Sequence, residues 1–564
     1  MGLPSAIGRK ASWQSIASKK RAEIFGKIPQ EWILSQSVLD QSKKEKKIVG
    51  GFIESLLDSE TLRITSLDPA DIAEKINGGS LTSVNVVRAF CKRAAIAHQL
   101  NNNLLEITFD AALRRAEELD RYFKENKKTV GPLHGLPYTF KDQFHQKGLP
   151  ATMAYVGWIG TFEGQRGTAK EETTESELVR ELDALGAVPI AKAGETNNNI
   201  LGYNFNPNSQ ALSSGGSSGG EGALQSLRGS AFGFGTDIGG SVSMPAAYNG
   251  IYSLKPSTGR LPFKDVATSS PGQQIIPAVV GALGPSISTL RLVFKSILST
   301  KPWLHDPDCL AIPFRQDEEI DVRTPPKLSF GLFEADGVVT PHPPISRALQ
   351  VAAKALKAQG HKIISWEPPS HAESAIIHPS FTQADGLGDV LDNVALSGEP
   401  LVPQIAHMFA NGRKQPVPLL TFFNSTLHLK NFRARYQAYW SSTVDKTGTG
   451  RPVDAVILPV GPQAAVIPGK SFYYTYGSFV NVLDYVSIVI PVTTADKNID
   501  VPVKDYKPLS EKDKKTWEAY DAEAYDGAPA AIQLLGRRLE EEKLLSIAQV
   551  VVDALVKQSK GSKI

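Results

Sequence analysis

Two stretches rich in glycine and serine follow each other closely, Ser213-Ser214-Gly215-Gly216-Ser217-Ser218-Gly219-Gly220-Glu221-Gly222 and Gly233-Phe234-Gly235-Thr236-Asp237-Ile238-Gly239-Gly240-Ser241. Both are embedded between segments with the pattern of a folded chain and contain Asp or Glu, which is not typical of a flexible linker. Glycine allows consecutive N–H groups to point into one concavity, which suits a phosphate or the oxyanion of acyl transfer. A phosphate loop ends in Gly-Lys-Ser/Thr, and neither stretch does. The pattern therefore favours an oxyanion-binding loop beside a serine.

A serine hydroxyl is a weak nucleophile until a base takes its proton. None of the ten histidines lies between His145 and His305, so the segment has no local histidine base. A buried lysine can do this work if its pKa falls by about 3 units, or about 4 kcal/mol. The candidate is Lys141, at the end of the strand-like segment 136–140, whose neighbours are apolar and aromatic. The alternative is a surface lysine paired with Asp142.

From about residue 130 onward, strand-like and helix-like patterns alternate, which predicts an α/β fold. After Thr174, an apolar helical face ends at Gly186 and a strand follows at 187–191. Further buried strands are expected at 455–460, 486–492 and 530–535. The segments 301–327 and 370–450 have no firm interpretation, and the second could be an insertion that shapes a pocket.

The first hundred residues have helical patterns. Apolar residues recur at helical spacing over 13–25, Asp68-Pro69 is a helix start, and another helix begins at Thr82. We expect 1–100 to form an N-terminal helical arm packed on a catalytic domain of 101–564, in a single compact body.

Composition describes an ordinary globular protein, with 41% apolar and 21% charged residues among 564. A net charge of +3 implies neither nucleic acid nor an anionic membrane as partner. Cys91 and Cys309 have no spacing for a disulfide framework or a zinc site. No apolar run is long enough to cross a membrane and no signal peptide is recognised, so a cytoplasmic location is expected. Ala6 does not fit the myristoylation pattern, and Ser562-Lys563-Ile564 is one residue from a peroxisomal address, which makes the peroxisome the alternative.

The chain resembles the amidase signature family, and most of it is similar to fungal acetamidase-type members. The resemblance extends from the Trp13 helix to Gly536-Arg537. Its motifs are Gly135-Leu136-Pro137 with Lys141-Asp142, the segments 215–224 and 235–241, Pro245-Ala246-Ala247, Asn249-Gly250 and Leu254-Lys255-Pro256. The resemblance implies a large mixed, twisted β-sheet covered by helices on both faces.

The resemblance also implies a mechanism. Lys141 is the base, Ser217 is a proton relay that follows a cis peptide bond, and Ser241 is the nucleophile that forms an acyl-enzyme. The oxyanion hole would be formed by the backbone N–H groups of Ile238, Gly239, Gly240 and Ser241. Ser218 and Asp237 would support the relay serine and the loop. The implied reaction converts a carboxylic amide to an acid and ammonia or an amine, with no cofactor and no metal.

One position departs from the family pattern. Many members carry Arg two residues after the nucleophile, whereas this chain has Ser243. Asp237 would then lack its usual cationic partner, which puts the charge balance of the loop in question.

Three alternatives remain open. The chain could be an amidotransferase subunit that releases ammonia from glutamine, or a catalytically inactive binding protein. Residues 215–219 also satisfy GxSxG, the nucleophile motif of α/β-hydrolases, although mostly polar residues precede them. The expected partner is a small-molecule amide, and a homodimer is left open. The motifs do not choose among aliphatic, aromatic and fatty amides, and the pocket walls are expected within 370–480, including Tyr473, Tyr474 and Tyr476.

Overall fold

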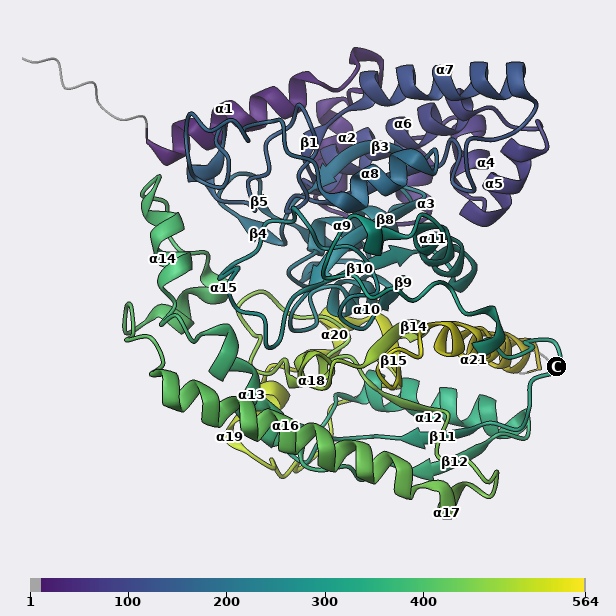
Figure 1. Cartoon of the computed structure of the whole chain (residues 1–564), viewed down its shortest axis with the longest axis vertical. Coiled ribbons are helices and arrows are strands. Elements are labelled where there is room, and N and C mark those ends of the chain that lie inside the picture. Colours follow the sequence, from purple (N-terminus) through teal and green to yellow (C-terminus); the bar gives the residue numbers. More distant parts are fainter. Residues whose placement is uncertain (1–11, 562–564) are drawn as a thin grey trace, which may run out of the picture.

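An eleven-stranded sheet runs through the centre of the molecule (Figure 1). The structure is a computed structural model that describes residues 12–561. The strand order is β1-β3-β2-β8-β10-β9-β14-β15-β13-β11-β12. β2 is parallel to β3 and β8, β11 is parallel to β12 and β13, and the other pairs are antiparallel. The mixed sheet predicted from the family resemblance is confirmed.

The strands of the sheet have the following bounds: β1 Leu104–Ile107, β2 Pro137–Lys141, β3 Val188–Ala193, β8 Phe232–Asp237, β9 Tyr252–Lys255, β10 Val279–Gly284, β11 Ser329–Leu332, β12 Lys362–Ser365, β13 Ala455–Pro459, β14 Val486–Thr494 and β15 Pro529–Gly536. Two hairpins lie outside it, β4 Asn197–Asn198 with β5 Gly202–Tyr203, and β6 Phe205–Asn206 with β7 Ser209–Ser213. Every strand segment expected from the sequence forms a strand. Long aliphatic runs such as β15 occupy the middle, where both faces of a strand are buried.

The helices have the following bounds: α1 Trp13–Gly26, α2 Gln36–Ser42, α3 Gly51–Glu54, α4 Ser59–Thr65, α5 Pro69–Asn77, α6 Ser83–Asn101, α7 Phe109–Asn126, α8 Glu177–Ala184, α9 Gly219–Ser226, α10 Ser243–Asn249, α11 Ile287–Ser299, α12 Pro343–Ala358, α13 His371–Thr382, α14 Gly388–Ala395, α15 Pro403–Ala406, α16 Leu419–Ser442, α17 Val444–Thr447, α18 Thr475–Leu483, α19 Glu511–Glu518, α20 Ala522–Tyr525 and α21 Glu541–Gly561. Helices surround the sheet: α9 and α10 contact each other and its central strands, and α12 and α21 form a second pair against β14 and β15.

The N-terminal helices begin where the sequence predicts. Asp68 caps α5 and accepts the Ala70 N–H at 2.9 Å, and Thr82 caps α6. α6 contacts β2, β3 and α9, while α1 contacts β1. The division into 1–100 and 101–564 stays a prediction. Residues 1–11 and 562–564, which include Ala6 and the Ser562-Lys563-Ile564 ending, lie outside the described residues.

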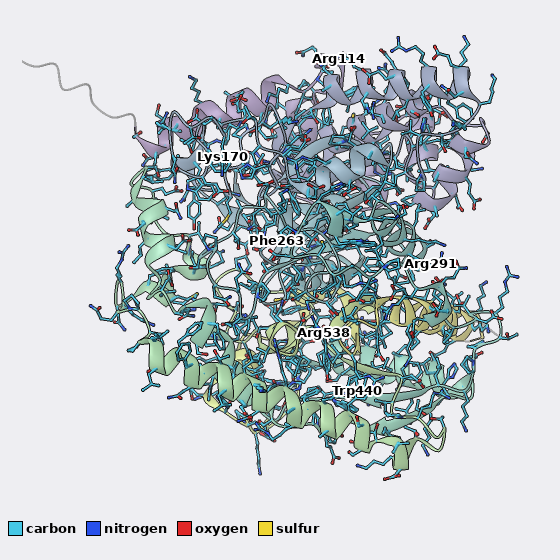
Figure 2. All side chains as sticks on the ribbon, in the orientation of Figure 1. Arg114, Lys170, Phe263, Arg291, Trp440 and Arg538 are labelled. Atoms are coloured by element: carbon cyan, nitrogen blue, oxygen red, sulfur yellow. The ribbon has the colours of Figure 1, made fainter. Side chains whose placement is uncertain are left out.

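The segment 370–450, which had no firm interpretation, is mostly helical. Its longest helix, α16, lies at the opposite side of the view from α7 (Figure 1). The inner face of α16 packs in a second hydrophobic cluster through Phe432, Tyr436 and Trp440, the last labelled in Figure 2. Among residues 12–561, no helix combines the length and the apolar character that crossing a membrane requires.

Candidate active site

Lys141 is the last residue of β2 and its side chain is only 2% exposed. Its Nζ donates to Ser217 Oγ at 2.6 Å and to Thr236 Oγ1 at 3.3 Å. β2 and β8 are parallel neighbours, so the end of β2 lies beside Thr236 near the end of β8. The interpretation of Lys141 as a surface residue paired with Asp142 is therefore wrong.

Asp142 pairs with a different lysine. Its carboxylate lies 2.9 Å from Lys192 Nζ, both side chains are fully buried, and Thr152 donates to Asp142 through its N–H at 2.8 Å. A carboxylate in this position needs a partner because an unpaired buried charge is strongly destabilising. The pair fixes the β2–β3 register immediately beyond Lys141.

We expect Lys192→Met to lower the free energy of unfolding by about 3–5 kcal/mol, because it leaves Asp142 buried without its cation. Urea titration followed by circular dichroism measures the change. The matched control is Lys192→Met with Asp142→Asn, which removes the uncompensated charge and should recover part of the loss. A single variant as stable as the parent would show that the pair contributes nothing.

Ser217 lies in a turn held close to the proposed nucleophile. The Gly216–Ser217 peptide bond is cis, as the family resemblance implies. Thr196 donates its hydroxyl to Gly215 O at 2.5 Å, and the Ser218 N–H donates to Ser241 O at 3.2 Å. The structure therefore places the turn that carries Ser217 against the backbone of Ser241. Lys141 contacts the same turn through the Ser217 hydroxyl.

Ser218 packs beneath the strand that leads to the nucleophile. Its side chain is fully buried, and a Cβ added at Gly235 would lie 2.5 Å from its Oγ. Glycine at 235 is therefore required by close packing and not by backbone conformation.

Asp237 organises the loop before α10. Its carboxylate accepts the N–H of Gly240 at 2.7 Å, of Val242 at 2.8 Å and of Ser243 at 3.3 Å. The oxyanion hole stays a prediction, but the N–H of Gly240 already donates to Asp237 and is not free for an oxyanion. In the described part of the chain, no acceptor is bound to the N–H groups of Ile238, Gly239 and Ser241, which leaves three donors.

The charge of Asp237 is balanced although position 243 is serine. The three N–H donors supply much of the stabilisation that a carboxylate needs. Lys255 is buried close by and donates to Tyr485 O at 2.8 Å. Burial lowers the pKa of Lys255, whereas Asp484 and Asp237 raise it. Backbone donors therefore contact Asp237 directly, and the buried Lys255 of β9 acts on it only through longer-range electrostatics.

Two residues near the site were missed by the sequence analysis. Glu195 lies with its Oε1 3.2 Å from Lys141 Nζ. His378, on α13, lies with its Nε2 2.8 Å from Ile238 O, and its ring would be 3.2 Å from a Cβ at Gly239. Burial lowers the pKa of His378. No local pattern marks either residue, because His378 is 140 positions from Ile238 and Glu195 is recognised only by its contact with Lys141.

The three expected pocket tyrosines have different surroundings. The hydroxyl of Tyr473 donates to Asp336 Oδ2 and that of Tyr476 to Val339 O, both at 2.6 Å, so these two hold the loop between β11 and α12. Tyr474 is 45% exposed, with its ring centroid 6.2 Å from that of His378. Tyr474 therefore neighbours His378, which in turn contacts the loop that contains Ile238.

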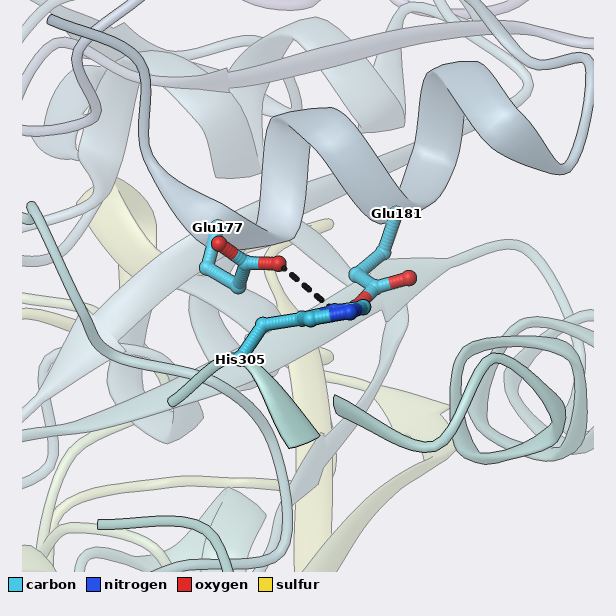
Figure 3. A group of neighbouring side chains, drawn as sticks. All are labelled: Glu177, Glu181 and His305. Atoms are coloured by element: carbon cyan, nitrogen blue, oxygen red, sulfur yellow. Dashed lines mark hydrogen bonds and ion pairs between the residues drawn. The ribbon is translucent and has the colours of Figure 1, made fainter. Parts of the chain in front are cut away.

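One group of side chains in the described residues has the composition of a metal site, namely Glu177 and Glu181 of α8 with His305 (Figure 3). The Nδ1 of His305 lies 3.2 Å from the first carboxylate and 3.1 Å from the second. Glu177 also pairs with Arg180 at 2.9 Å. These contacts join α8 to the segment that carries His305. His342 and His371 are instead buried among aromatic rings.

The strand before Ser217 is β7, which pairs with β6 in a two-stranded sheet. A nucleophile elbow follows a strand of the central sheet. The α/β-hydrolase interpretation of residues 215–219 is therefore wrong.

Comparison with known proteins shows the family of the chain. The sequence model described as Amidase matches residues 85–545. The chain belongs to the amidase signature family. As a member it is a hydrolase of amide carbon–nitrogen bonds. It is 40% identical to the acetamidase of Aspergillus oryzae over 557 residues, with 96% of this chain and 98% of the relative covered. An acetamidase of Emericella nidulans is also 40% identical, with the same coverage.

Solved structures agree on the fold. A fatty acid amide hydrolase superposes with a TM-score of 0.88 at 31% identity, covering 96% of this chain and 95% of that protein. An amidase superposes with a TM-score of 0.66 at 20% identity, covering 86% and 99%. The amidase fold is therefore shared along nearly the whole chain.

Proposed function

We propose that this amidase is a serine hydrolase in which Ser241 attacks the amide carbonyl, Ser217 relays the proton and Lys141 accepts it. The hydrogen bond from Lys141 Nζ to Ser217 Oγ at 2.6 Å, in a buried position, carries the proposal. The contact of Ser218 N–H with Ser241 O supports it, because it ties the relay turn to the nucleophile.

In the acylation step, the Ser241 oxygen forms a bond to the carbonyl carbon while its proton passes to Ser217. The proton of Ser217 passes in turn to Lys141, and the carbonyl electron pair moves onto oxygen. The N–H groups of Ile238, Gly239 and Ser241 would stabilise that oxyanion, each donor contributing roughly 3 kcal/mol. The protonated lysine then returns a proton through Ser217 to the leaving nitrogen, and water hydrolyses the acyl-enzyme.

We propose a short aliphatic amide as substrate, because two relatives at 40% identity are acetamidases. The pocket wall beside Ile238 would be formed by α13 through His378.

A fluorophosphonate probe tests the nucleophile on the purified chain. We expect one probe per chain, and peptide mass spectrometry should place it on Ser241. Absence of labelling would favour the inactive binding protein.

Ammonia release from acetamide, benzamide and a long-chain amide tests the substrate class. We expect the highest kcat/KM for acetamide. Glutamine serves as the control for the amidotransferase alternative, which would be favoured if the isolated chain released ammonia from glutamine alone.

A further inference from the structure

A largely buried carboxylate accompanies the proposed base. Glu195 follows β3, and its side chain is 14% exposed while that of Lys141 is 2% exposed. Its Oε1 lies 3.2 Å from Lys141 Nζ, and its Oε2 is buried without a hydrogen-bond partner among residues 12–561. Because a buried carboxylate is costly unless paired, the contact with Lys141 is its main compensation.

Among the described residues, three side-chain oxygens lie within hydrogen-bonding distance of Lys141 Nζ. They are Ser217 Oγ at 2.6 Å, Glu195 Oε1 at 3.2 Å and Thr236 Oγ1 at 3.3 Å. Thr236 donates its own hydroxyl proton to Gln143 Oε1 at 2.5 Å, so toward Lys141 it accepts. An ammonium group has three N–H donors. Once Lys141 has accepted a proton, each of its three N–H groups therefore has an oxygen to donate to.

The structure differs here from the apolar surroundings expected for Lys141. Its other charged neighbours form a compensated set, because Asp142 pairs with Lys192 at 2.9 Å. Burial raises the pKa of Glu195, Lys141 lowers it and Asp142 raises it. Tyr155 also interacts electrostatically with Glu195, and burial keeps the pKa of that phenol above its usual value. Lys141 is thus the cation in direct contact with the carboxylate.

We propose that Glu195 is a positioning residue that orients Lys141 Nζ toward Ser217 and stabilises the ammonium formed when Lys141 accepts the proton. This inference rests on the proposed function. In the step, the Ser217 O–H bond breaks, an N–H bond forms on Nζ, and Ser217 takes its replacement proton from Ser241. Glu195 itself neither gives nor takes a proton in this step. It has the role that a third group has in other nucleophile and base pairs, where it orients the base.

The proposal has a distinctive pH dependence. At low pH the resting enzyme holds Lys141 as an ammonium, which must first release a proton to solvent before it can accept the one from Ser217. The resting state and the state after proton transfer then both contain the ammonium, so Glu195 stabilises both equally. At high pH Lys141 starts as a neutral amine, and Glu195 then stabilises only the state with the transferred proton. Loss of the carboxylate should therefore have little effect at low pH and a growing effect as pH rises. A merely structural role would lower activity by the same factor at every pH.

The test compares the purified enzyme with Glu195→Gln. The readouts are kcat/KM for acetamide and the rate of fluorophosphonate labelling, each from pH 5 to pH 10. We expect the two proteins to agree within about threefold at the acid end. At the alkaline plateau the variant should be about 10- to 100-fold slower, the range expected for one charge-assisted contact. In the plot of log kcat/KM against pH, the rising limb of the variant should lie about one to two pH units lower, which corresponds to the same 10- to 100-fold change.

Glu399→Gln is the matched control, since Glu399 is also a buried carboxylate but accepts the Val156 N–H and has no contact with Lys141. Its profile should keep the shape of the parent. If Glu195→Gln does not fold, Glu195→Asp, which retains the charge on a shorter side chain, should show the same divergence with a smaller amplitude. A parallel loss at all pH values, or no change, would overturn the inference. An active Ser241→Ala enzyme would instead overturn the proposed function, so the two failures are distinguishable.

Discussion

Ser241→Ala should abolish amide hydrolysis, lowering kcat by about 10⁵- to 10⁶-fold, because removal of a nucleophile that works as a unit with its base leaves only binding and oxyanion stabilisation. The same variant should lose fluorophosphonate labelling completely. Release of ammonia from acetamide, measured with an enzyme-coupled assay, and mass spectrometry of the intact chain give the two readouts. Loss of both on a folded protein would assign the nucleophile.

The matched control is Ser243→Ala, two residues along the same loop. The contact of Ser243 with Asp237 is made by its backbone N–H, so the substitution leaves that hydrogen bond in place. We expect activity within about threefold of the parent and an unchanged far-ultraviolet circular dichroism spectrum. Ser241→Ala with parental activity would show that another residue attacks the amide.

Lys141→Met should lower kcat/KM and the rate of probe labelling together, by about 10²- to 10⁴-fold, which is the usual contribution of a general base. The two rates should fall in parallel because Lys141 would act on activation of the nucleophile, which hydrolysis and labelling share. Methionine preserves much of the volume of the lysine side chain at a site that is only 2% exposed. Steady-state kinetics and timed labelling measure the two effects.

Lys141→Met also leaves the Glu195 carboxylate buried without its cation, and the protein could lose stability for that reason alone. The double variant Lys141→Met with Glu195→Gln removes this charge and separates the two effects. It should regain thermal stability and remain as slow as the single variant. Recovery of activity in the double variant would show that Lys141 has a structural and not a proton-accepting role.

Local features of the chain were predictable from local patterns. The helix after Thr174, the Gly186 stop and the strand that follows form as α8 and β3. The strand at 136–140 places Lys141 at its end, as expected. These predictions succeed because the spacing of apolar residues and the position of a turn are set by residues that lie within a single helix, strand or turn.

The sequence by itself therefore predicted the N-terminal helices, the strands of the sheet that it singled out and the amidase family, and it named Lys141, Ser217 and Ser241 as candidate site residues. The tertiary structure decided which charges meet: Lys192 with Asp142, Glu195 with Lys141, and Asp237 with backbone N–H groups where an arginine was expected. It also brought α13 over Ile238. Such contacts depend on how strands pair and helices pack between residues that are far apart in the sequence. The local sequence around each side chain does not indicate them.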